Sequence, residues 1–315
     1  MGFYHKPVFL REVLAYLDPQ PGKIMVDCTA GGGGHSKALL ERLLPGGKLV
    51  ALDQDLDAVQ KLQEVLHGFG EENYEIVHSN FVNLRKIAEG LLLREADGIL
   101  FDLGVSSYQL DEQERGFSYQ QDALLDMRMD RTKKLTAAQL VNEASPKELA
   151  RIITEYGEEN WAVRIASFIV DARKRTRIET TRQLAEIIKA AIPSGARRTG
   201  PHPAKRTFQA LRIAVNDELG ILPKALTQGV QLLKPGGEMA VITFHSLEDR
   251  ITKKIFQEMG QGCICPKDLP VCVCHHKPLV KNILGKPLTP TEEELNNNPR
   301  SRSAKLRVVE KTGEF

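Results

Sequence analysis

The first hundred residues alternate between short apolar runs and amphipathic stretches, and this alternation constrains the fold more than any other feature of the chain. The apolar runs predict strands over Lys23–Cys28, Lys48–Leu52, Tyr74–His78 and Gly98–Leu103. Helices predicted over Ser36–Leu44 and Leu56–His67 separate the first three. Because parallel strands need long crossover connections, usually helices, this order predicts an α/β fold built on a parallel sheet.

After Ser107 the alternation stops. The helices predicted in the following segment are Ala137–Val141, Pro146–Tyr156, Asn160–Arg173 and Thr181–Ala191. From Asp217 the sheet pattern resumes with a helix, a strand (Glu238–Phe244), a further helix (Leu247–Met259) and an antiparallel pair formed by Leu279–Leu284 and Lys305–Glu310. We therefore expect a doubly wound domain, residues 1–107 and 214–315, interrupted by an inserted all-helical domain, residues 108–213.

Positive charge is concentrated in the predicted insert. Between Arg164 and Arg212 there are 12 Lys and Arg against 3 Asp and Glu, whereas the rest of the chain has 31 against 38. The basic residues fall mainly in two clusters, Arg173–Arg177 and Arg197–Arg206. Such asymmetry indicates a polyanionic partner, because basic side chains that neutralise phosphates release counterions. A solvated helical face is the alternative interpretation.

A glycine-rich loop, Gly31–Gly34, lies between the first predicted strand and its helix. Glycine lets the backbone turn tightly and approach a ligand closely at this edge of a parallel sheet. The spacing is not G-x-G-x-x-G, and no Gly-Lys-Ser/Thr follows, which excludes a Walker loop. Asp53, at the end of the second strand, can accept both hydroxyls of a ribose. Phe81, after the third strand, either packs on adenine or is an ordinary core aromatic.

These features suit both nicotinamide enzymes and S-adenosylmethionine enzymes. The turn Lys234–Gly237 favours the second class, because it resembles the turn before the fifth strand of class I methyltransferases. Asp102, at the end of the fourth strand, is the candidate catalytic residue, since a carboxylate there can hold an amine in line and take its proton. The Asp/Asn-Pro-Pro-Tyr/Phe signature of many amino-methylating enzymes is absent. Binding of the cofactor alone is therefore the alternative role for Asp102.

Several separated motifs carry a resemblance to one family. They are His5–Val8, Asp27–Ser36, Asp102–Ser107, Arg115–Ser118, Asp126–Asp130, Arg206–Arg212, Phe244–Arg250 and Asn298–Ser303. They resemble the RsmH (MraW) family, the bacterial 16S rRNA cytosine-N4 methyltransferases, over nearly the whole chain. The resemblance implies a class I (Rossmann-like) fold, S-adenosylmethionine as methyl donor, and methylation of N4 of one cytidine in the decoding region. The implied partner is 16S rRNA, within the small ribosomal subunit or a late assembly particle.

The resemblance also implies which residues bind the cofactor: Gly33, Gly34, His35, Asp53, Phe81, Asp102 and Gln109. Gln109 rests on the resemblance alone. In a basic RNA-recognition insert, Phe117, Tyr119 or Phe208 can stack on bases, although for each of them a place in the core is the favoured interpretation. His245 either lines the pocket or is a hydrogen-bonded structural residue.

Four of the five cysteines form two Cys-x-Cys pairs, Cys263/Cys265 and Cys272/Cys274, and His275 and His276 follow. These residue types can hold structural zinc, with disulfides as the alternative. No catalytic metal is expected, because methyl transfer from a sulfonium needs none. The fifth cysteine, Cys28, is expected to be a small buried residue.

The start of the chain lacks the apolar stretch of a signal peptide, and no apolar run is long enough to cross a bilayer. We expect a cytoplasmic protein with no membrane partner, and a homodimer is left open. Three alternative functions remain at this point: a nicotinamide oxidoreductase, an RNA chaperone that binds the cofactor without turnover, and a DNA cytosine methyltransferase.

Overall fold

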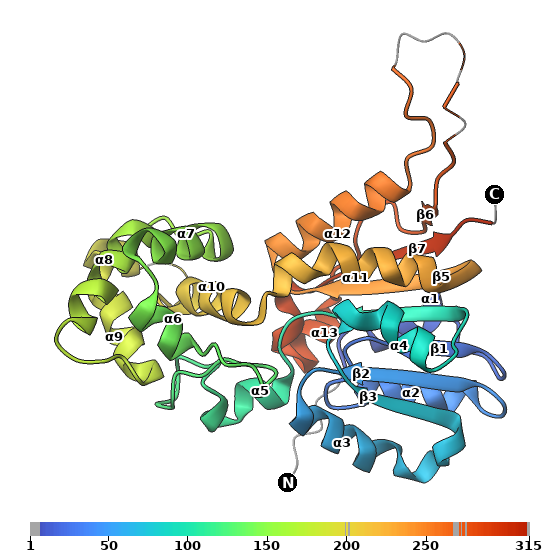
Figure 1. Ribbon diagram of the computed structural model, residues 1–315, viewed down its shortest axis with the longest axis horizontal. Helices are drawn as coiled ribbons and strands as arrows, with labels where there is room; N and C mark the ends of the chain where they lie inside the picture. The colour runs from blue at the N-terminus through green and yellow to red at the C-terminus, as the bar shows by residue number, and fades with distance from the viewer. Residues whose placement is uncertain are drawn as a thin grey trace. The chain divides into compact units, whose positions relative to one another are not determined.

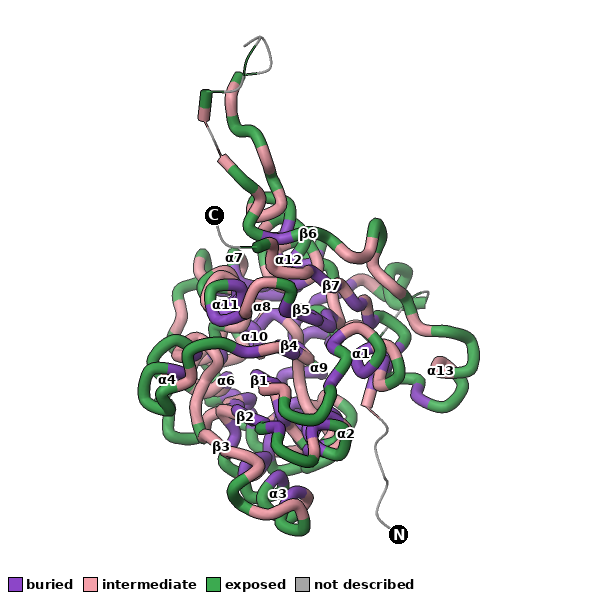
Figure 2. Tube along the Cα trace, turned by 90° about the vertical axis from the view of Figure 1, so that its right-hand side faces the viewer, coloured by how far each residue is buried: buried purple, intermediate pink, exposed green. Residues whose placement is uncertain are grey.

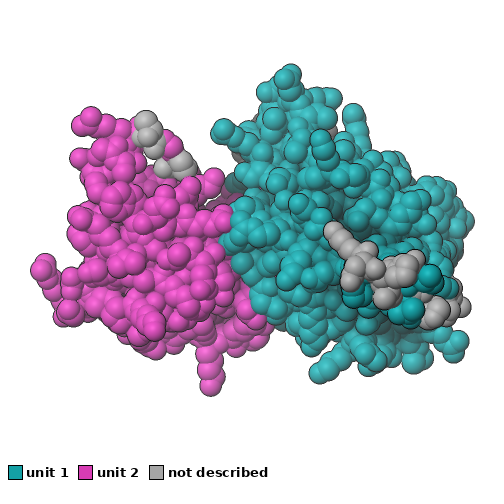
Figure 3. Space-filling model, turned by 90° about the horizontal axis from the view of Figure 1, so that it is seen from above, with its two compact units in different colours: residues 1–104, 219–315 teal, residues 105–218 magenta. Residues whose placement is uncertain are grey.

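A computed structural model describes residues 7–198, 200, 202–266, 271, 273–274 and 276–313 (Figure 1). The chain divides into two compact units (Figure 3). The first comprises residues 1–104 and 219–315, and the second comprises residues 105–218. None of the described helices is long and apolar enough to cross a membrane.

The first unit contains a seven-stranded sheet. Its strands are β1 (Ile24–Asp27), β2 (Lys48–Asp53), β3 (Tyr74–His78), β4 (Ala96–Asp102), β5 (Leu233–Thr243), β6 (Val280–Asn282) and β7 (Lys305–Lys311). Their order is β3-β2-β1-β4-β5-β7-β6. The first five strands are parallel, and β7 runs antiparallel to both β5 and β6. The sheet is therefore doubly wound, and its order reverses between β1 and β4.

Helices cover both faces of this sheet. They are α1 (Leu10–Leu17), α2 (Gly34–Leu43), α3 (Leu56–Leu66), α4 (Leu84–Gly90), α11 (Glu218–Leu232), α12 (Ser246–Met259) and α13 (Glu292–Asn297). Side chains alternate between two apolar cores along the strands. In β4, Ile99 and Phe101 join the core that contains α4 and α11, whereas Leu100 joins the core that contains α1 and α2. Because both faces are covered, the central strands are almost wholly buried (Figure 2).

The predicted parallel sheet and its closing antiparallel pair are confirmed, with differences at some strand ends. The strand after the insert begins at Leu233 rather than Glu238, so the Lys234–Gly237 turn lies inside β5. There the register with β4 shifts between the pairs Ala96↔Leu233 and Gly98↔Glu238. Gly236 takes a positive φ of 76°, which explains a bulge at this glycine pair.

The second unit is helical. Its helices are α5 (Ser107–Asp111), α6 (Ala137–Glu143), α7 (Pro146–Gly157), α8 (Ala162–Arg173), α9 (Thr181–Ala191) and α10 (Lys205–Asn216). They surround a separate apolar core that includes Ile153, Ile165 and Leu184. The four helices predicted in this segment are present. Ser145 and Thr180 cap α7 and α9 by accepting hydrogen bonds from the backbone, as their side chains predict.

The segment Asp126–Asp130, one of the motifs of the resemblance, is held by buried hydrogen bonds. Asn216 of α10 accepts from the Met129 amide at 2.8 Å and donates to the Met127 carbonyl at 2.8 Å. Arg115 donates to the Met129 carbonyl at 3.1 Å. These bonds fix Met127 in a left-handed conformation, φ 62°, which is costly for a residue with a side chain. The motif therefore has a structural role within the helical unit.

Asn216→Ala should lower the free energy of unfolding of the helical unit by about 2–4 kcal/mol, because a buried N–H and a buried carbonyl lose their partner. Urea unfolding followed by far-UV circular dichroism measures this, and hydrogen exchange of the 125–131 segment locates it. Asn297→Ala, at an exposed position of α13, is the control and should change stability by less than about 0.5 kcal/mol. Equal effects of the two variants would contradict the structural role of Asn216.

Candidate active site at the carboxyl edge of the sheet

Strand β1 ends two residues earlier than the strands on either side of it. Asp27, its last residue, pairs with Ala51 of β2 and Leu100 of β4. Strand β2 continues to Asp53, and β4 continues to Asp102. The early end of β1 therefore leaves room between two strand ends that each carry a carboxylate.

The glycine-rich loop occupies that room. After Asp27 the backbone still bonds to both neighbours: the Cys28 amide donates to the Leu100 carbonyl, and the Ala30 amide donates to the Leu52 carbonyl, each at 2.9 Å. The loop is thus tied to β4 on one side and to β2 on the other. This is the point where the strand order reverses, which is where doubly wound sheets bind their ligands.

Asp27 anchors the loop by hydrogen bonds. Its side chain is fully buried, and it accepts hydrogen bonds from the Ser36 hydroxyl at 2.7 Å and from the Thr29 amide at 3.1 Å. Burial raises the pKa of Asp27, and the Ser36 hydroxyl opposes that rise. The sequence reasoning gave Asp27 no role. Its position at the carboxyl end of the first strand, before the glycines, is the signal that could have identified it.

Gly33 and Gly34 are required for different reasons. Gly33 precedes α2 with a φ of 82°, a left-handed conformation that favours glycine. Gly34 has no room for a side chain, because a Cβ there would lie 2.4 Å from Cγ of Pro7. A side chain at either position would displace the start of α2, whose first amides face the strand ends.

The side chain of Asp53 is held by hydrogen bonds from backbone amides, one of them in the glycine-rich loop. Its two carboxylate oxygens accept from the Gly31 amide and the Asp55 amide, each at 2.8 Å. Burial among the strand ends raises the pKa of Asp53 to about 6, against the opposing effect of these two donors. The residue keeps partial contact with solvent. Each oxygen has a further lone pair, so the carboxylate retains the capacity to accept ribose hydroxyls.

Phe81 begins a short 3-10 helix, Phe81–Asn83, after β3. Its ring packs edge-on against Phe101 of β4, with ring centroids 5.7 Å apart and an interplanar angle of 77°. Phe81 is only partly buried. It therefore contributes to the core, and its exposed part remains available to a ligand.

His35 connects the loop to the fourth strand. Its Nε2 lies 3.0 Å from the Val8 carbonyl, which can only accept, so Nε2 carries a proton. Its Nδ1 lies 3.4 Å from Oδ2 of Asp102. Burial lowers the pKa of His35, but the Asp102 and Asp27 carboxylates and the Val8 carbonyl together outweigh burial, and the net shift is upward. The surroundings of His35 therefore favour its charged form, which pairs with a carboxylate at Asp102.

The second oxygen of Asp102, Oδ1, is buried and has no hydrogen-bond partner among the described residues. The Asp102 amide is fixed by the Thr29 hydroxyl at 2.5 Å. A buried carboxylate oxygen without a donor is costly, and in native structures such a group often marks a site where a ligand donates. The group that fits has an N–H or O–H to offer, as an amine does.

Gln109 lies in the other unit, in α5. It is buried, and its side chain accepts from the Ser106 amide at 3.1 Å while its own amide donates to the Ser106 hydroxyl at 3.2 Å. This reciprocal pair is a capping box that begins α5. These contacts give Gln109 a helix-capping role, and its contact with the cofactor stays a prediction.

The other aromatic and histidine candidates divide between core and surface. Phe117 and Phe208 are buried in the core of the helical unit, which is the alternative to base stacking considered for each. Tyr119 is partly exposed, and its ring stacks on that of His202 at a centroid distance of 4.5 Å. His245 caps α12 in a reciprocal pair with Glu248, which gives it a structural role.

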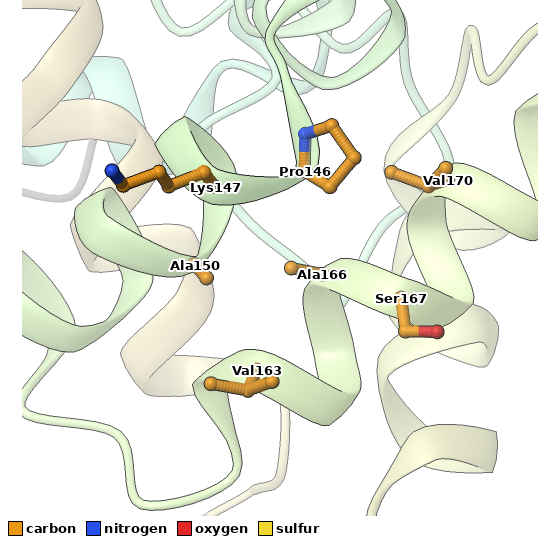
Figure 4. Close-up of a pocket in the computed structure, with 7 residues that line it drawn as sticks. All are labelled: Pro146, Lys147, Ala150, Val163, Ala166, Ser167 and Val170. Carbon is orange, nitrogen blue, oxygen red and sulfur yellow. The ribbon is translucent and has the colours of Figure 1, made fainter.

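A cavity of about 370 Å³ lies within the helical unit, between α7 and α8 (Figure 4). Its lining residues are Pro146, Lys147, Ala150, Val163, Ala166, Ser167 and Val170. These residues include no carboxylate or amide side chain to bind a ribose or an adenine. The cavity therefore does not qualify as a nucleoside-cofactor site.

The sheet order, with a reversed β7 between β5 and β6, and a carboxylate-lined edge above a glycine loop together define a class I methyltransferase. The family model described as "MraW methylase family" matches residues 2–312. The chain belongs to this family.

Curated relatives match over almost the full length of both chains. "Ribosomal RNA small subunit methyltransferase H" of Symbiobacterium thermophilum is 56% identical over 311 residues, which cover 99% of this chain and 98% of the relative. The protein of the same name from Acetivibrio thermocellus is 56% identical over 312 residues, 99% of this chain and 100% of the relative. That of Brevibacillus brevis is 52% identical, with 99% of each covered.

Asp53→Asn should weaken S-adenosylmethionine binding about 10- to 150-fold, the effect of losing a hydrogen bond to a charged group. In the parent protein, affinity should fall as the pH drops through about 6, where the Asp53 carboxylate gains its proton. The carboxylate binds hydroxyls best when ionised, so the bound state is favoured above that pH. Isothermal titration calorimetry between pH 5 and pH 8 measures both effects.

His35 and Asp27 also titrate near this site, so the comparison of the two proteins is the decisive one. Asp53→Asn should lose the part of the pH dependence that arises between pH 5 and about pH 7. A variant that keeps the same slope would show that Asp53 is not the titrating group.

Proposed function

We propose that this protein transfers the methyl group of S-adenosylmethionine to N4 of a cytidine in the decoding region of 16S rRNA. The observation that carries the proposal is the buried Oδ1 of Asp102 at the carboxyl edge of the sheet, to which none of the described residues donates a hydrogen bond. Membership of the MraW methylase family and full-length relatives named as small-subunit rRNA methyltransferases support the substrate.

The residues at the edge fit the cofactor. Asp53 would accept the ribose hydroxyls, Phe81 would pack on the adenine, and Gly33 and Gly34 would let the backbone approach the ligand closely. When bound, S-adenosylmethionine supplies an electrophilic methyl group on a positively charged sulfur.

Asp102 would act on the methyl acceptor. The cytosine amine is a poor nucleophile, because its lone pair is delocalised into the ring. A carboxylate that accepts one N–H of this amine holds it in line and raises its electron density. As the new N–C bond forms and the S–C bond breaks, nitrogen becomes positively charged. Oδ1 is then placed to take the proton that the nitrogen must lose.

His35 would position Asp102. Nδ1 of His35 lies 3.4 Å from Oδ2, which leaves Oδ1 for the acceptor and fixes the plane of the carboxylate. His35 is therefore proposed as a positioning residue rather than as a proton acceptor.

The basic residues of the helical unit divide into two groups. Arg173 donates to the carbonyls of Val141 and Ala144, and Arg212 pairs with Glu218 at 2.9 Å, so both serve the unit itself. A second group is exposed and makes no ion pair within the described part of the chain: Arg175, Arg197, Arg198 and Lys205. We expect this second group to contact RNA phosphates.

Asp102→Asn should lower kcat by about 10²- to 10⁴-fold, the usual contribution of a proton acceptor, and change the dissociation constant of S-adenosylmethionine by less than about tenfold. The asparagine keeps one acceptor oxygen but cannot take the proton. Labelled S-adenosylmethionine and small subunits from cells that lack the enzyme are used, and nucleosides are identified by mass. Asp171→Asn, an exposed carboxylate, is the control and should retain full activity.

The acceptor panel separates the alternative functions. Label in N4-methylcytidine from small subunits or naked rRNA, and none from DNA, is the expected result. Label on DNA would favour a DNA methyltransferase. No label on any acceptor, with cofactor binding intact, would favour an RNA-binding protein without turnover. If Asp102→Asn lowers cofactor binding and activity to the same extent, the role of Asp102 would be cofactor binding alone.

Removing two phosphate contacts with Arg197→Ala/Arg198→Ala should reduce the slope of log Kd against log salt by about 1.4–1.8, since each phosphate contact contributes about 0.7–0.9. Fluorescence anisotropy with an rRNA fragment between 50 and 200 mM salt, roughly the range over which such contacts are released, measures this. The control Lys61→Ala/Arg85→Ala removes two exposed positive charges from the other unit and should leave the slope unchanged. Equal slopes for both variants would place the phosphate contacts elsewhere.

A further inference from the structure

The described residues between α12 and β6, namely 260–266, 271, 273–274 and 276–279, extend away from the sheet (Figure 1). The two ends of this segment are tied together, because the Leu279 amide donates to the Met259 carbonyl at 2.7 Å. Beyond these ends, none of the described residues of the segment is buried, and Ile264 and Val273 are exposed. Apolar burial therefore does not hold this segment, which we call the excursion, in place. A cross-link is needed to stabilise it instead.

Three cysteines supply the groups for such a cross-link. The sulfur atoms of Cys263, Cys265 and Cys274 all lie within 4.8 Å of one another. Those of Cys263 and Cys274 are 3.8 Å apart. A disulfide bond would require about 2.05 Å. Sulfur ligands about 2.3 Å from a tetrahedrally coordinated zinc ion are about 3.8 Å from each other. The separation of 3.8 Å is too long for a disulfide, and it fits two ligands of one ion as well as a hydrogen bond between two thiols.

The backbone is folded around these sulfur atoms. Four amides donate to them at 3.4–3.5 Å: Ile264 and His276 to Cys274, Cys265 to Cys263, and Val273 to Cys265. Backbone amides often donate to the sulfur atoms of metal-bound cysteines and so orient them. Three sulfur atoms that lie within 4.8 Å of one another can share one ion. The arrangement therefore suits a metal ion.

We propose that Cys263, Cys265 and Cys274 bind a structural Zn²⁺ ion that closes this excursion. Thiolate sulfur selects soft or borderline ions and excludes Mg²⁺ and Ca²⁺, and a tetrahedral sulfur site favours zinc. His276 stabilises the site without binding the ion in this arrangement. Its Nδ1 is hydrogen-bonded to the Gly262 carbonyl at 2.6 Å, which joins the outgoing and returning parts of the excursion. Cys272 and His275 lie outside the described residues, and the fourth ligand is not assigned.

The ion has no role in methyl transfer. The carboxylates proposed to act there are the last residues of β2 and β4, whereas the three cysteines lie between α12 and β6. The proposal therefore does not depend on the proposed function, and a metal measurement tests it without an activity assay.

The test is the metal content of the full chain, purified without a metal-binding tag. Inductively coupled plasma mass spectrometry should find about one zinc ion per chain. X-ray absorption spectroscopy at the zinc edge should show sulfur atoms at about 2.3 Å from the zinc ion. Cobalt substituted for zinc should give the intense visible bands of a tetrahedral ion and a thiolate charge-transfer band. Cys263→Ser and Cys274→Ser should each bind less than about a tenth of an equivalent. Cys28→Ala, which removes the buried cysteine outside the excursion, should keep its zinc.

Several results would overturn the proposal. One is a folded parent chain that carries no zinc and takes up none from a zinc–chelator buffer. A second is iron or an iron–sulfur cluster in place of zinc. A third is an intact mass two hydrogens short per cysteine pair, which indicates a disulfide. If the serine variants do not fold, the cobalt spectrum and the X-ray absorption of the parent chain still decide the question.

Discussion

Three neighbouring strands each end in a carboxylate at the same edge of the sheet. The fold depends on the hydrogen bonds and the ion pair that stabilise these three acidic groups close together. Asp27 is the deepest, and it is bonded by the Ser36 hydroxyl and the Thr29 amide. Asp53 is held by two backbone amides. Asp102 is paired with His35. Burial is the main cause of the raised pKa of Asp27, and the nearby Asp102 carboxylate adds to the rise, whereas the Ser36 hydroxyl and His35 oppose it. The edge can therefore hold three acids and leave acceptor capacity free.

The sequence predicted the parts of this edge that local patterns encode. Apolar runs located the five parallel strands, and a polar residue after each run located Asp53 and Asp102. The early end of β1 was not predictable, because Cys28 extends the apolar run beyond Asp27. The pairing of His35 with Asp102 joins residues 67 positions apart, so no local pattern reveals it. The core positions of Phe117 and Phe208 depend in the same way on helices packed from distant parts of the chain.

The charge pattern of the insert shows why composition alone overstates a binding surface. An arginine can cap carbonyls within its own domain as well as bind a phosphate, since its fork of donors suits both. Arg173 and Arg212 are committed to internal contacts, and only the three-dimensional contacts distinguish them from Arg197 and Arg198. The segment does carry an excess of positive charge, but fewer of its basic side chains are available to RNA than the number of Lys and Arg residues suggests.

The place of the insertion in the chain links the two proposed roles. The helical unit begins at residue 105, directly after the strand that ends in Asp102, and the chain returns to the sheet at residue 219. Segments that follow the carboxyl ends of parallel strands carry function in doubly wound folds, because the scaffold fixes their starting points. An insertion after β4 gives the helical unit, proposed to bind RNA, a covalent origin three residues from the proposed proton acceptor. An insertion after β3 would start beside Phe81, the residue proposed to pack on adenine. In the proposed site, β1, β2 and β3 would therefore serve the methyl donor and β4 the acceptor.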